Sequence, residues 1–437
     1  MSDLATLFHD APLDDGLRSG VAAAALEVRR VDDADRAQTD AWLEAVSRGF
    51  LDGERTEVQR QAYFDHTAHR RKVAVYDAGS PQPAIPVATF ASWATELSVP
   101  GGTVPACAIS SVTVAPTHRR RGLLRHLMSG ELRTAAALGF PLAALTVSES
   151  SIYGRFGFGA AVSAAGWEID VRRAGWVGPA ASGRIDFVSR ERGREIAESL
   201  HARIRPGMTG EVERPGGQWD FAFGTRPDAD KPERLRVLHY RGDGGEVDGL
   251  ALYSVSENEA DFASSTIHLT MLLAATDAAY ASLWQFLLSM DLIATIHAGE
   301  LAVDEPLWWM LADQRAAKIT LRDHHYLRVL DVPAALGARQ FGAADTLVLE
   351  VEDPLAIAGG TFVLTVDESG AASVDPVDHA PLGELAVRIG ITELSAILLG
   401  GVSPVTLARA GRLQTDDPAR VARVFGTTAA PRLSFWY

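Results

Sequence analysis

The stretch from Ile109 to Met128 reads ISSVTVAPTHRRRGLLRHLM and decides the fold class of the chain. Its first part, up to Val114, is rich in β-branched residues, which favour a strand. After Gly122, leucines recur at helical spacing. The sequence therefore predicts a strand, a turn rich in arginine and then a helix that runs to Leu138.

This turn, residues 119–122, is called the arginine turn below, and it has the chemistry of an anion-binding site. The first N–H groups of a helix have no partner within the helix, and the helix dipole adds positive charge there. Arg119, Arg120 and Arg121 add guanidinium groups that can donate to phosphate, and Gly122 lets a ligand approach the backbone. Taken alone, HRRRG is also compatible with a solvated basic turn.

Predicted elements on both sides of the arginine turn complete one α/β domain. Apolar residues recur every three to four positions over residues 36–50, which predicts an amphipathic helix. Runs of β-branched residues separated by Gly and Pro predict an antiparallel meander. The meander covers residues 73–79, 86–96 and 106–116, and another strand follows the helix at residues 141–148.

The middle of the chain repeats this order of elements without the arginine turn. A strand at 264–274, a helix at 277–290 and a strand at 291–299 follow one another, which we interpret as a degenerate second copy. After residue 331, short strands precede helical segments, an order typical of a small α+β domain. The predicted parts are an N-terminal extension of open order at 1–27, a first domain at 28–171, a second at 172–325 and a C-terminal domain at 326–437.

Composition narrows the class of protein. Of 437 residues, 47% are hydrophobic and 22% charged, as in ordinary globular proteins. The net charge of −15 disfavours nucleic acid as the main partner and suits a cationic substrate. Cys107 is the single cysteine, which excludes an internal disulfide and a cysteine-based metal cluster. The acidic start and the lack of a run of about 20 apolar residues predict a cytoplasmic protein without a membrane span.

Two strings around the arginine turn resemble a known family. VTVAPTHRRRGLLRHLM, followed by SESSIYGRFGFG, is similar to the Eis-type (enhanced intracellular survival) N-acetyltransferases of the GNAT (GCN5-related N-acetyltransferase) superfamily. Arg119-x-x-Gly122-x-Leu124 matches the pyrophosphate turn of that superfamily, with leucine where most members have a small residue and the Eis-type proteins have Leu-Leu. The resemblance implies a mixed α/β and α+β protein, with tandem GNAT folds followed by a sterol-carrier-protein-like domain.

The resemblance also implies an acetyl-CoA site. Val112, Thr113 and Val114 match the strand whose backbone contacts the pantetheine and the thioester. Ser148 and Glu149 match a further cofactor contact at the end of the next strand. The residues that match the pyrophosphate turn are Arg119, Arg120, Arg121, Gly122, Leu123, Leu124 and Arg125.

Two tyrosines match catalytic positions of the family. Tyr153 opens YGRFGFG and matches the general acid that protonates the departing coenzyme A thiolate, a role suited to a phenol with an ordinary pKa of about 10. The family uses the carboxylate of its last residue as the base, which here is Tyr437. The ending PRLSFWY, with three aromatics, predicts a buried and anchored terminus. A terminal carboxyl with a pKa of about 3.5 would act through a water or by orienting the amine.

The implied activity is acetyl-CoA-dependent N-acetylation of aminoglycosides or polyamine-like amines by direct attack, in a homohexamer and without a metal. Lysine side chains of peptides are an alternative acceptor, and a non-catalytic protein that binds a ligand in its carrier-like domain is an alternative of another class. His66, His69 and the pair His324-His325 lack the spacing of a metal site. The sequence leaves the amine, lipid binding by the C-terminal domain and the role of residues 1–27 open.

Overall fold

The computed structural model describes residues 2–381 and 383–437, which form two compact units. Unit 1 comprises the chain up to Val162, His325–Thr428 and Trp436–Tyr437. Unit 2 comprises Ser163–His324 and Ala429–Phe435. In the part of the chain that the structure describes, no helix is both long and apolar enough to cross a membrane.

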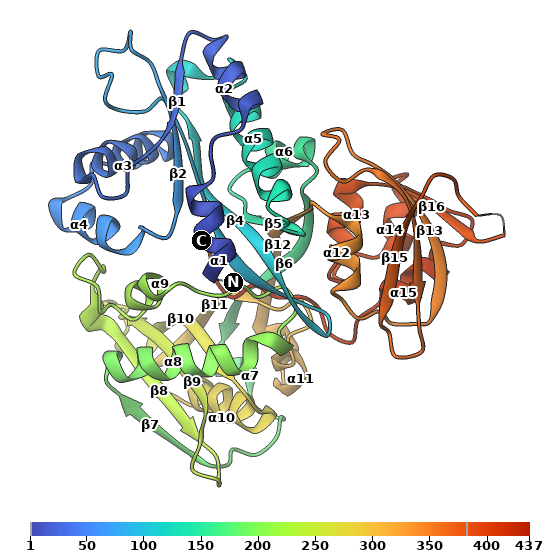
Figure 1. The fold of residues 1–437 in the computed structure, drawn as a ribbon. Coiled ribbons are helices and arrows are strands. Elements are labelled where there is room, and N and C mark those ends of the chain that lie inside the picture. Colours follow the sequence, from blue (N-terminus) through green and yellow to red (C-terminus); the bar gives the residue numbers. More distant parts are fainter. Residues whose placement is uncertain (1, 382) are drawn as a thin grey trace. The chain divides into compact units, whose positions relative to one another are not determined.

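The N-terminal part of unit 1 contains a mixed sheet (Figure 1). Its second, third and fourth strands pair antiparallel, which confirms the predicted meander. The fifth strand pairs parallel with the fourth and antiparallel with the sixth. In order across the sheet the strands are β1 (Glu27–Arg30), β2 (Arg71–Tyr76), β3 (Ala88–Val99), β4 (Gly102–Val114), β5 (Leu142–Thr146) and residues 325–329 of β12 (Ala317–Val329).

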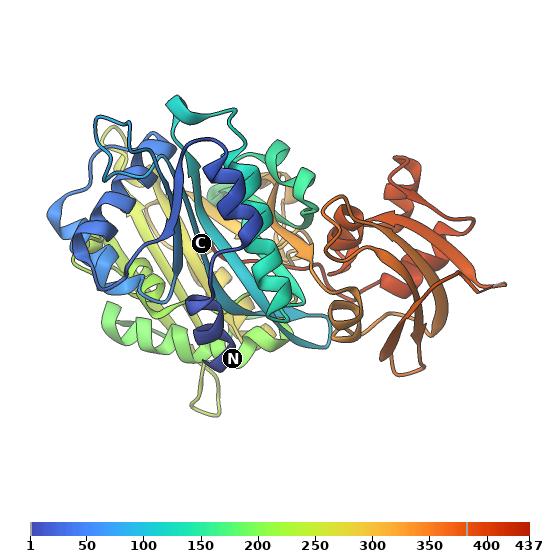
Figure 2. The same cartoon turned by 45° about the horizontal axis from the view of Figure 1, so that its top comes forward.

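Helices cover both faces of this sheet (Figures 1 and 2). Because side chains alternate along a strand, Val73 and Val75 of β2 face one helical layer, while Ala74 and Tyr76 face the other. The first layer contains α5 (Leu123–Ala137), and the second contains α3 (Arg36–Phe50), which has the predicted bounds. The layer of α3 is completed by α4 (Glu57–His66).

The N-terminal extension, whose order the sequence left open, is a helical part of unit 1. It forms α1 (Ser2–Asp10) and α2 (Asp15–Ala22), and Phe8 and Leu17 are fully buried in the core that α5 also covers. The buried Arg71 guanidinium donates to main-chain oxygens of the extension and pairs with the buried Glu131 of α5 at 2.9 Å. The extension therefore packs against the helix that follows the arginine turn.

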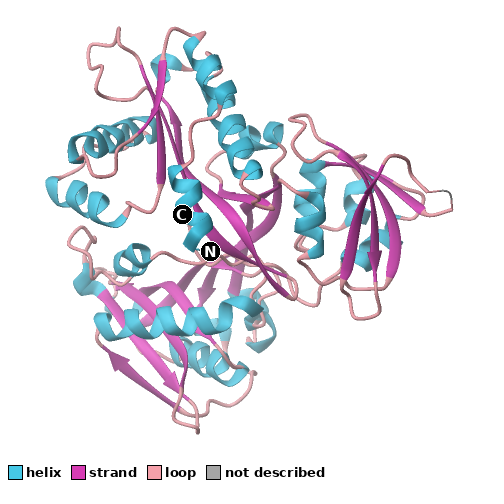
Figure 3. Ribbon diagram, in the orientation of Figure 1, coloured by secondary structure: helices cyan, strands magenta, loops and turns pink. Residues whose placement is uncertain are grey.

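The C-terminal subdomain, residues 332–428, has a separate sheet with helices beside it (Figure 3). Across that sheet the order is β15 (Ala372–Val377), β14 (Gly360–Val366), β13 (Asp345–Glu352), β16 (Leu385–Gly390) and β17 (Leu413–Gln414). The helices are α12 (Val332–Gly337), α13 (Ile391–Ile397), α14 (Pro404–Arg409) and α15 (Pro418–Phe425). The buried Arg339 guanidinium lies over the rings of Phe341 and Phe425 and donates to main-chain carbonyls, so part of this interior is occupied by a charged side chain.

Unit 2 repeats the order of strand, helix and parallel strand. Its strands lie in the order β6 (Gly159–Asp170), β11 (Ile293–Leu301), β10 (Ser265–Ala274), β9 (Val247–Ser256), β8 (Leu235–Arg241) and β7 (Arg184–Val188). One face packs against α10 (Asp277–Leu288) and the other against α8 (Arg190–Ile204), a helix that the sequence analysis did not predict. Strands β10 and β11 are parallel, as strands β4 and β5 are in unit 1.

Candidate active site

Two adjoining cavities of unit 1 lie at the carboxyl end of β4. The larger has a volume of about 740 Å³ and the smaller about 150 Å³. Four residues line both of them: Phe50, Val112, Ser148 and Tyr153. A ligand in the larger cavity therefore reaches the smaller one beside Tyr153.

A bulge in β4 opens this region. Thr113 lies opposite Thr89 and Ser110 lies opposite Ala91, so three steps along β4 match two along β3. Ser111, inside the bulge, has a φ of 52°, in the left-handed region that few non-glycine residues adopt. Pairing of β4 with β5 reaches only Ile109, whereas β4 continues to Val114. The two strands thus separate, and backbone groups of β4 become available to a ligand.

The arginine turn supplies the anion-binding end of the larger cavity. Arg120 has a φ of 64° and Gly122 a φ of 77°, and such left-handed residues in a turn gather backbone N–H groups into a concave anion site. Gly122 is the N-cap of α5 and has no side chain with which to cap the first amides of the helix. These amides, the helix dipole and the arginine side chains all favour a negatively charged ligand.

The structure brings nearly all predicted cofactor residues together. The structure describes all twelve predicted cofactor residues, and among them only Arg121 does not line the larger cavity. Arg121 acts on Asp77 instead. The pKa of the Asp77 carboxyl is lowered by a hydrogen bond from His118 and, to a smaller extent, by the charge of Arg121. The predicted residues in the lining are Val112, Thr113, Val114, Arg119, Arg120, Gly122, Leu123, Leu124, Arg125, Ser148 and Glu149.

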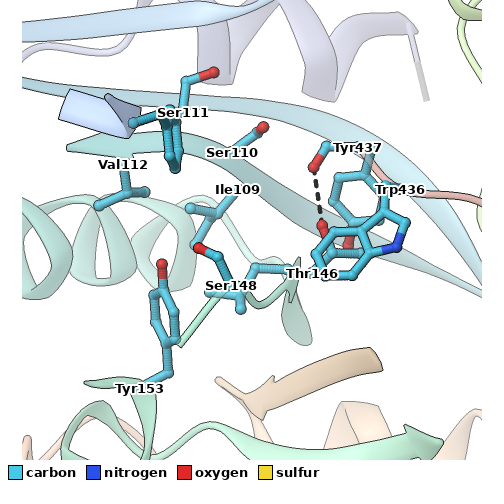
Figure 4. Close-up of a pocket in the computed structure, with 11 residues that line it drawn as sticks. Ile109, Ser110, Ser111, Val112, Thr146, Ser148, Tyr153, Trp436 and Tyr437 are labelled. Atoms are coloured by element: carbon cyan, nitrogen blue, oxygen red, sulfur yellow. Dashed lines mark hydrogen bonds between the residues drawn. The ribbon is translucent and has the colours of Figure 1, made fainter. Parts of the chain in front are cut away.

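Tyr153 lies at the junction of the two cavities. It ends the short helix α6 (Ser150–Tyr153), and only 9% of its surface is exposed. Its hydroxyl points into the space near Val112 and Ser148 (Figure 4). Burial, with a contribution from the charge of Glu149, raises the pKa of Tyr153 to about 12. The phenol is therefore protonated at neutral pH and suited to donate a proton.

Tyr437 lines the smaller cavity and is held at both ends (Figure 4). Thr146 Oγ1 donates over 3.0 Å to the main-chain oxygen of Tyr437, which is one oxygen of the terminal carboxylate. The Tyr437 hydroxyl lies 2.7 Å from His325 Nε2, and its ring meets the edge of Trp93 at a centroid distance of 5.5 Å. Of the three final aromatics that were predicted to be buried, Phe435 is buried, Tyr437 is half-buried and Trp436 has 43% of its surface exposed.

Several residues of this region were missed in the sequence analysis. His325 was considered only as a metal ligand, yet it contacts Tyr437. No motif in the sequence marks Thr146 or Phe50 as a site residue, since each reaches the site only through folding. The other cavity-lining residues that were not predicted include Ser110, Ser111, His118, Ile152, Arg155, Phe156 and Leu355.

Among residues 2–381 and 383–437, no group of three or more His, Cys, Asp or Glu side chains is placed to hold a metal ion. The single cysteine, Cys107, is buried in β4.

Comparison with known proteins assigns a family to this geometry. Residues 28–161 and 210–329 match two different family models, each described as an acetyltransferase (GNAT) domain, and residues 332–434 match a sterol carrier protein domain. The chain is 38% identical to an uncharacterized N-acetyltransferase of Streptomyces avermitilis over 90% of this chain and 96% of that protein. It is 35% identical to N-acetyltransferase Eis of Mycobacterium tuberculosis over 75% of this chain and 79% of that protein.

The chain belongs to the Eis-type GNAT N-acetyltransferases. Its fold agrees with the crystal structure of Eis1 from Mycobacterium abscessus, with a TM-score of 0.79, 27% identity and coverage of 94% of this chain and 100% of that chain. A GCN5-related N-acetyltransferase from Kribbella flavida shares the fold at a TM-score of 0.72 and 22% identity. The predicted family and the predicted fold class, two GNAT domains and a sterol-carrier-like domain, are thus confirmed.

Membership of this Eis-type family makes the protein an N-acetyltransferase. The first GNAT match, residues 28–161, contains the arginine turn and Tyr153, and the second, residues 210–329, extends past the predicted end of the second domain at 325. The predicted domain boundaries and the roles assigned to individual site residues remain predictions.

Proposed function

We propose that this N-acetyltransferase transfers the acetyl group of acetyl-CoA to amino groups of aminoglycosides or polyamine-like molecules. One observation carries the proposal: the arginine turn and Tyr153 line one cavity, while Tyr437 lines the cavity that adjoins it. This arrangement suits a ligand with a polyanionic end and a reactive acyl end.

In the proposed reaction the backbone of β4 and the arginine turn hold the acyl donor in the larger cavity. The nitrogen of the acceptor attacks the thioester carbonyl carbon, a C–N bond forms and the C–S bond breaks. Tyr153 gives its proton to the departing thiolate and is reprotonated by the proton that the nitrogen releases as the amide forms. Its pKa of about 12 keeps the phenol protonated until the thiolate forms. Attack is direct, without an acyl-enzyme and without a metal.

The acceptor must first lose a proton, because an ammonium group has no free electron pair. We assign this step to the carboxylate of Tyr437, which orients the amine and accepts its proton directly or through a water. Thr146 and His325, through their contacts with the backbone and the hydroxyl of Tyr437, hold that residue in place. The net charge of −15 favours a cationic acceptor over a neutral one.

Release of coenzyme A thiol tests the proposal. The intact protein is given acetyl-CoA with aminoglycosides, polyamines or a lysine peptide, beside a variant with one glycine added after Tyr437. We expect turnover with the first two classes, and its collapse in the extended variant because the carboxylate is displaced. Faster turnover of the lysine peptide would favour protein lysines as acceptors. Acetyl-CoA binding without turnover of any amine would favour a ligand-binding protein.

The proposal includes a homohexamer, which sedimentation of the intact protein measures directly. A species of another size would contradict it.

A further inference from the structure

One residue in the lining of the larger cavity comes from the C-terminal subdomain. Leu355 lies in the loop between β13 and β14, more than 200 positions after the arginine turn in the sequence. Leu355 and Ile357 are partly buried and pack against the same core that contains Tyr153. Leu355 also lines the cavity, whereas Ile357 packs against the core without lining the cavity.

The carboxylate of Asp353 determines the shape of this loop. Its Oδ1 accepts from the backbone N–H of Leu355 at 3.1 Å, and its Oδ2 accepts from those of Ile357 at 2.9 Å and Ala358 at 2.8 Å. Ala356, between them, has a left-handed φ of 52°. Such a conformation costs free energy in an alanine, so the surrounding bonds must hold it.

A buried ion pair connects this loop to the segment after Tyr153. Arg328 donates from Nη2 to Asp353 Oδ2 at 2.7 Å, and both side chains are fully buried. Arg328 also donates from Nε to the carbonyl of Phe156 at 2.8 Å. Phe156 itself lines the cavity. A buried charge is costly without its partner, so the Arg328 guanidinium needs its bond to Asp353. Because the same planar guanidinium also bonds to Phe156, it fixes the position of the loop that carries Leu355 relative to Phe156.

Further contacts bring α13 of the subdomain against the same segment. Thr392 Oγ1 donates to the carbonyl of Gly154 at 3.2 Å. Ser395 Oγ, which donates to the Ile391 carbonyl at 2.7 Å, lies 3.4 Å from the carbonyl oxygen of Gly157. A side chain at Gly159 would collide with the Thr392 carbonyl, so the close approach requires glycine there. The turn that follows the proposed general acid is thus packed directly against the C-terminal subdomain.

We propose that Leu355 contacts the coenzyme A portion of acetyl-CoA, and that Asp353 positions it through its bonds to the loop and to Arg328. The C-terminal subdomain then forms one wall of the acyl-donor site. This inference rests on the proposed use of acetyl-CoA. It gives the sterol-carrier-like subdomain a part in acetyl transfer.

Leu355→Ala and Ile357→Ala form a matched pair for the test. The dissociation constant of coenzyme A is measured by calorimetry, the KM for acetyl-CoA by thiol release and the melting temperature by circular dichroism. Loss of an apolar contact in a pocket is expected to raise the dissociation constant and KM of Leu355→Ala by about tenfold, with kcat retained. Ile357→Ala is expected to lower the melting temperature and to leave coenzyme A binding unchanged.

Equal coenzyme A affinity in the intact protein and Leu355→Ala overturns the inference, as does an equal loss of affinity in both variants. Failure of the intact protein to bind coenzyme A would instead contradict the proposed function, so the two failures are distinguishable.

The positioning role of Asp353 is tested by Asp353→Glu, which keeps the charge beside Arg328 but displaces the bonds to the loop. If Asp353 acts through Leu355, the two effects are not independent. The double variant Asp353→Glu/Leu355→Ala then binds coenzyme A no more weakly than whichever single variant has the lower affinity. This role is overturned if the loss of coenzyme A affinity in the double variant equals the product of the losses in the two single variants. The pair Leu355→Ala and Ile357→Ala decides the cofactor contact even if Asp353→Glu does not fold.

Discussion

The two GNAT domains of this chain share a backbone arrangement but differ at the start of one helix. In the first domain β4 and β5 are parallel and pair as far as Ile109 and Leu145. In the second, β10 and β11 are parallel and pair as far as Leu269 and Ala298. Both β4 and β10 carry a bulge opposite the preceding strand. The geometry that separates the strands is therefore present in both domains.

The helix that follows each of these strands begins differently. Helix α5 starts after Gly122, so its first amides remain available to a ligand. Helix α10 starts after Thr276, whose side chain accepts from the N–H of Ala279, and Asp277 adds a negative charge in the first turn. The second helix thus caps one of its own first amides and carries a negative charge that repels an anion.

The cavities beside the separated strands also differ. In unit 2, Arg432 and Ser434 line a cavity of about 10 Å³ together with Leu269, and Leu269 also lines a cavity of about 420 Å³. In unit 1 the corresponding space belongs to cavities of about 740 and 150 Å³. Strand separation is therefore common to both domains. What distinguishes them is the helix start, which has no side-chain cap in α5 and is capped by Thr276 in α10.

The largest expected effect comes from removing the proposed acid of the first domain. Tyr153→Phe keeps the ring and loses the proton donor, so kcat is expected to fall by about 100-fold or more while the KM for acetyl-CoA changes little. Thiol release under saturating substrates measures this. An unchanged kcat would contradict the role of Tyr153.

The pH profile of the intact protein is the control for that substitution. Burial and Glu149 raise the pKa of Tyr153 to about 12, and the active form of an acid is the protonated one. No loss of kcat from ionisation of this phenol is therefore expected below about pH 10. A fall of kcat with an apparent pKa near 8 that is absent in Tyr153→Phe would show that the phenol titrates earlier.

A smaller but still large effect is expected when the first helix start is made acidic like the second. Gly122→Asp places a carboxylate beside the anion site, and coenzyme A affinity is expected to fall by about 100-fold. Gly122→Asn is the matched control, since it has the same shape and the same left-handed strain without the charge. The difference between them should shrink with added salt. Equal affinities in the two variants would sink the electrostatic explanation.

A moderate effect is expected at the end of the chain. Tyr437→Phe removes the hydroxyl that lies 2.7 Å from His325 Nε2 but keeps the ring and the backbone. Loss of one hydrogen bond should lower kcat by about three- to tenfold through poorer placement of the proposed base. His325→Gln, which retains a hydrogen-bonding group, should lose less. A larger loss of kcat in His325→Gln than in Tyr437→Phe would refute this placement role.

The smallest kinetic effect is expected in the second domain. Thr276→Ala removes the N-cap of α10 and should lower the free energy of unfolding by about 1 kcal/mol. Acetyl-CoA affinity and kcat should remain those of the intact protein, because the site lies in the first domain. Denaturant unfolding and thiol release measure both quantities. Altered acetyl-CoA affinity would mean that the second domain also takes part in binding the donor.

Elements with strong local patterns were predictable, and those held by distant contacts were not. The periodicity of residues 36–50 predicted α3 with its actual ends, and the meander before the arginine turn was correct. Helix α8 is rich in charged residues and has a weaker apolar pattern, so it was missed. The extension was left open for a similar reason, because Arg71 and Glu131, far along the chain, order it.

By itself the sequence determined the family, the order of the domains and the arginine turn, because these depend on residues adjacent in the chain. Only the tertiary structure decided that Thr146 and His325 hold Tyr437 and that Leu355 joins the wall of the cavity. Such contacts join residues more than 100 positions apart. Their formation depends on the packing of whole sheets and helices, a property that no local pattern encodes.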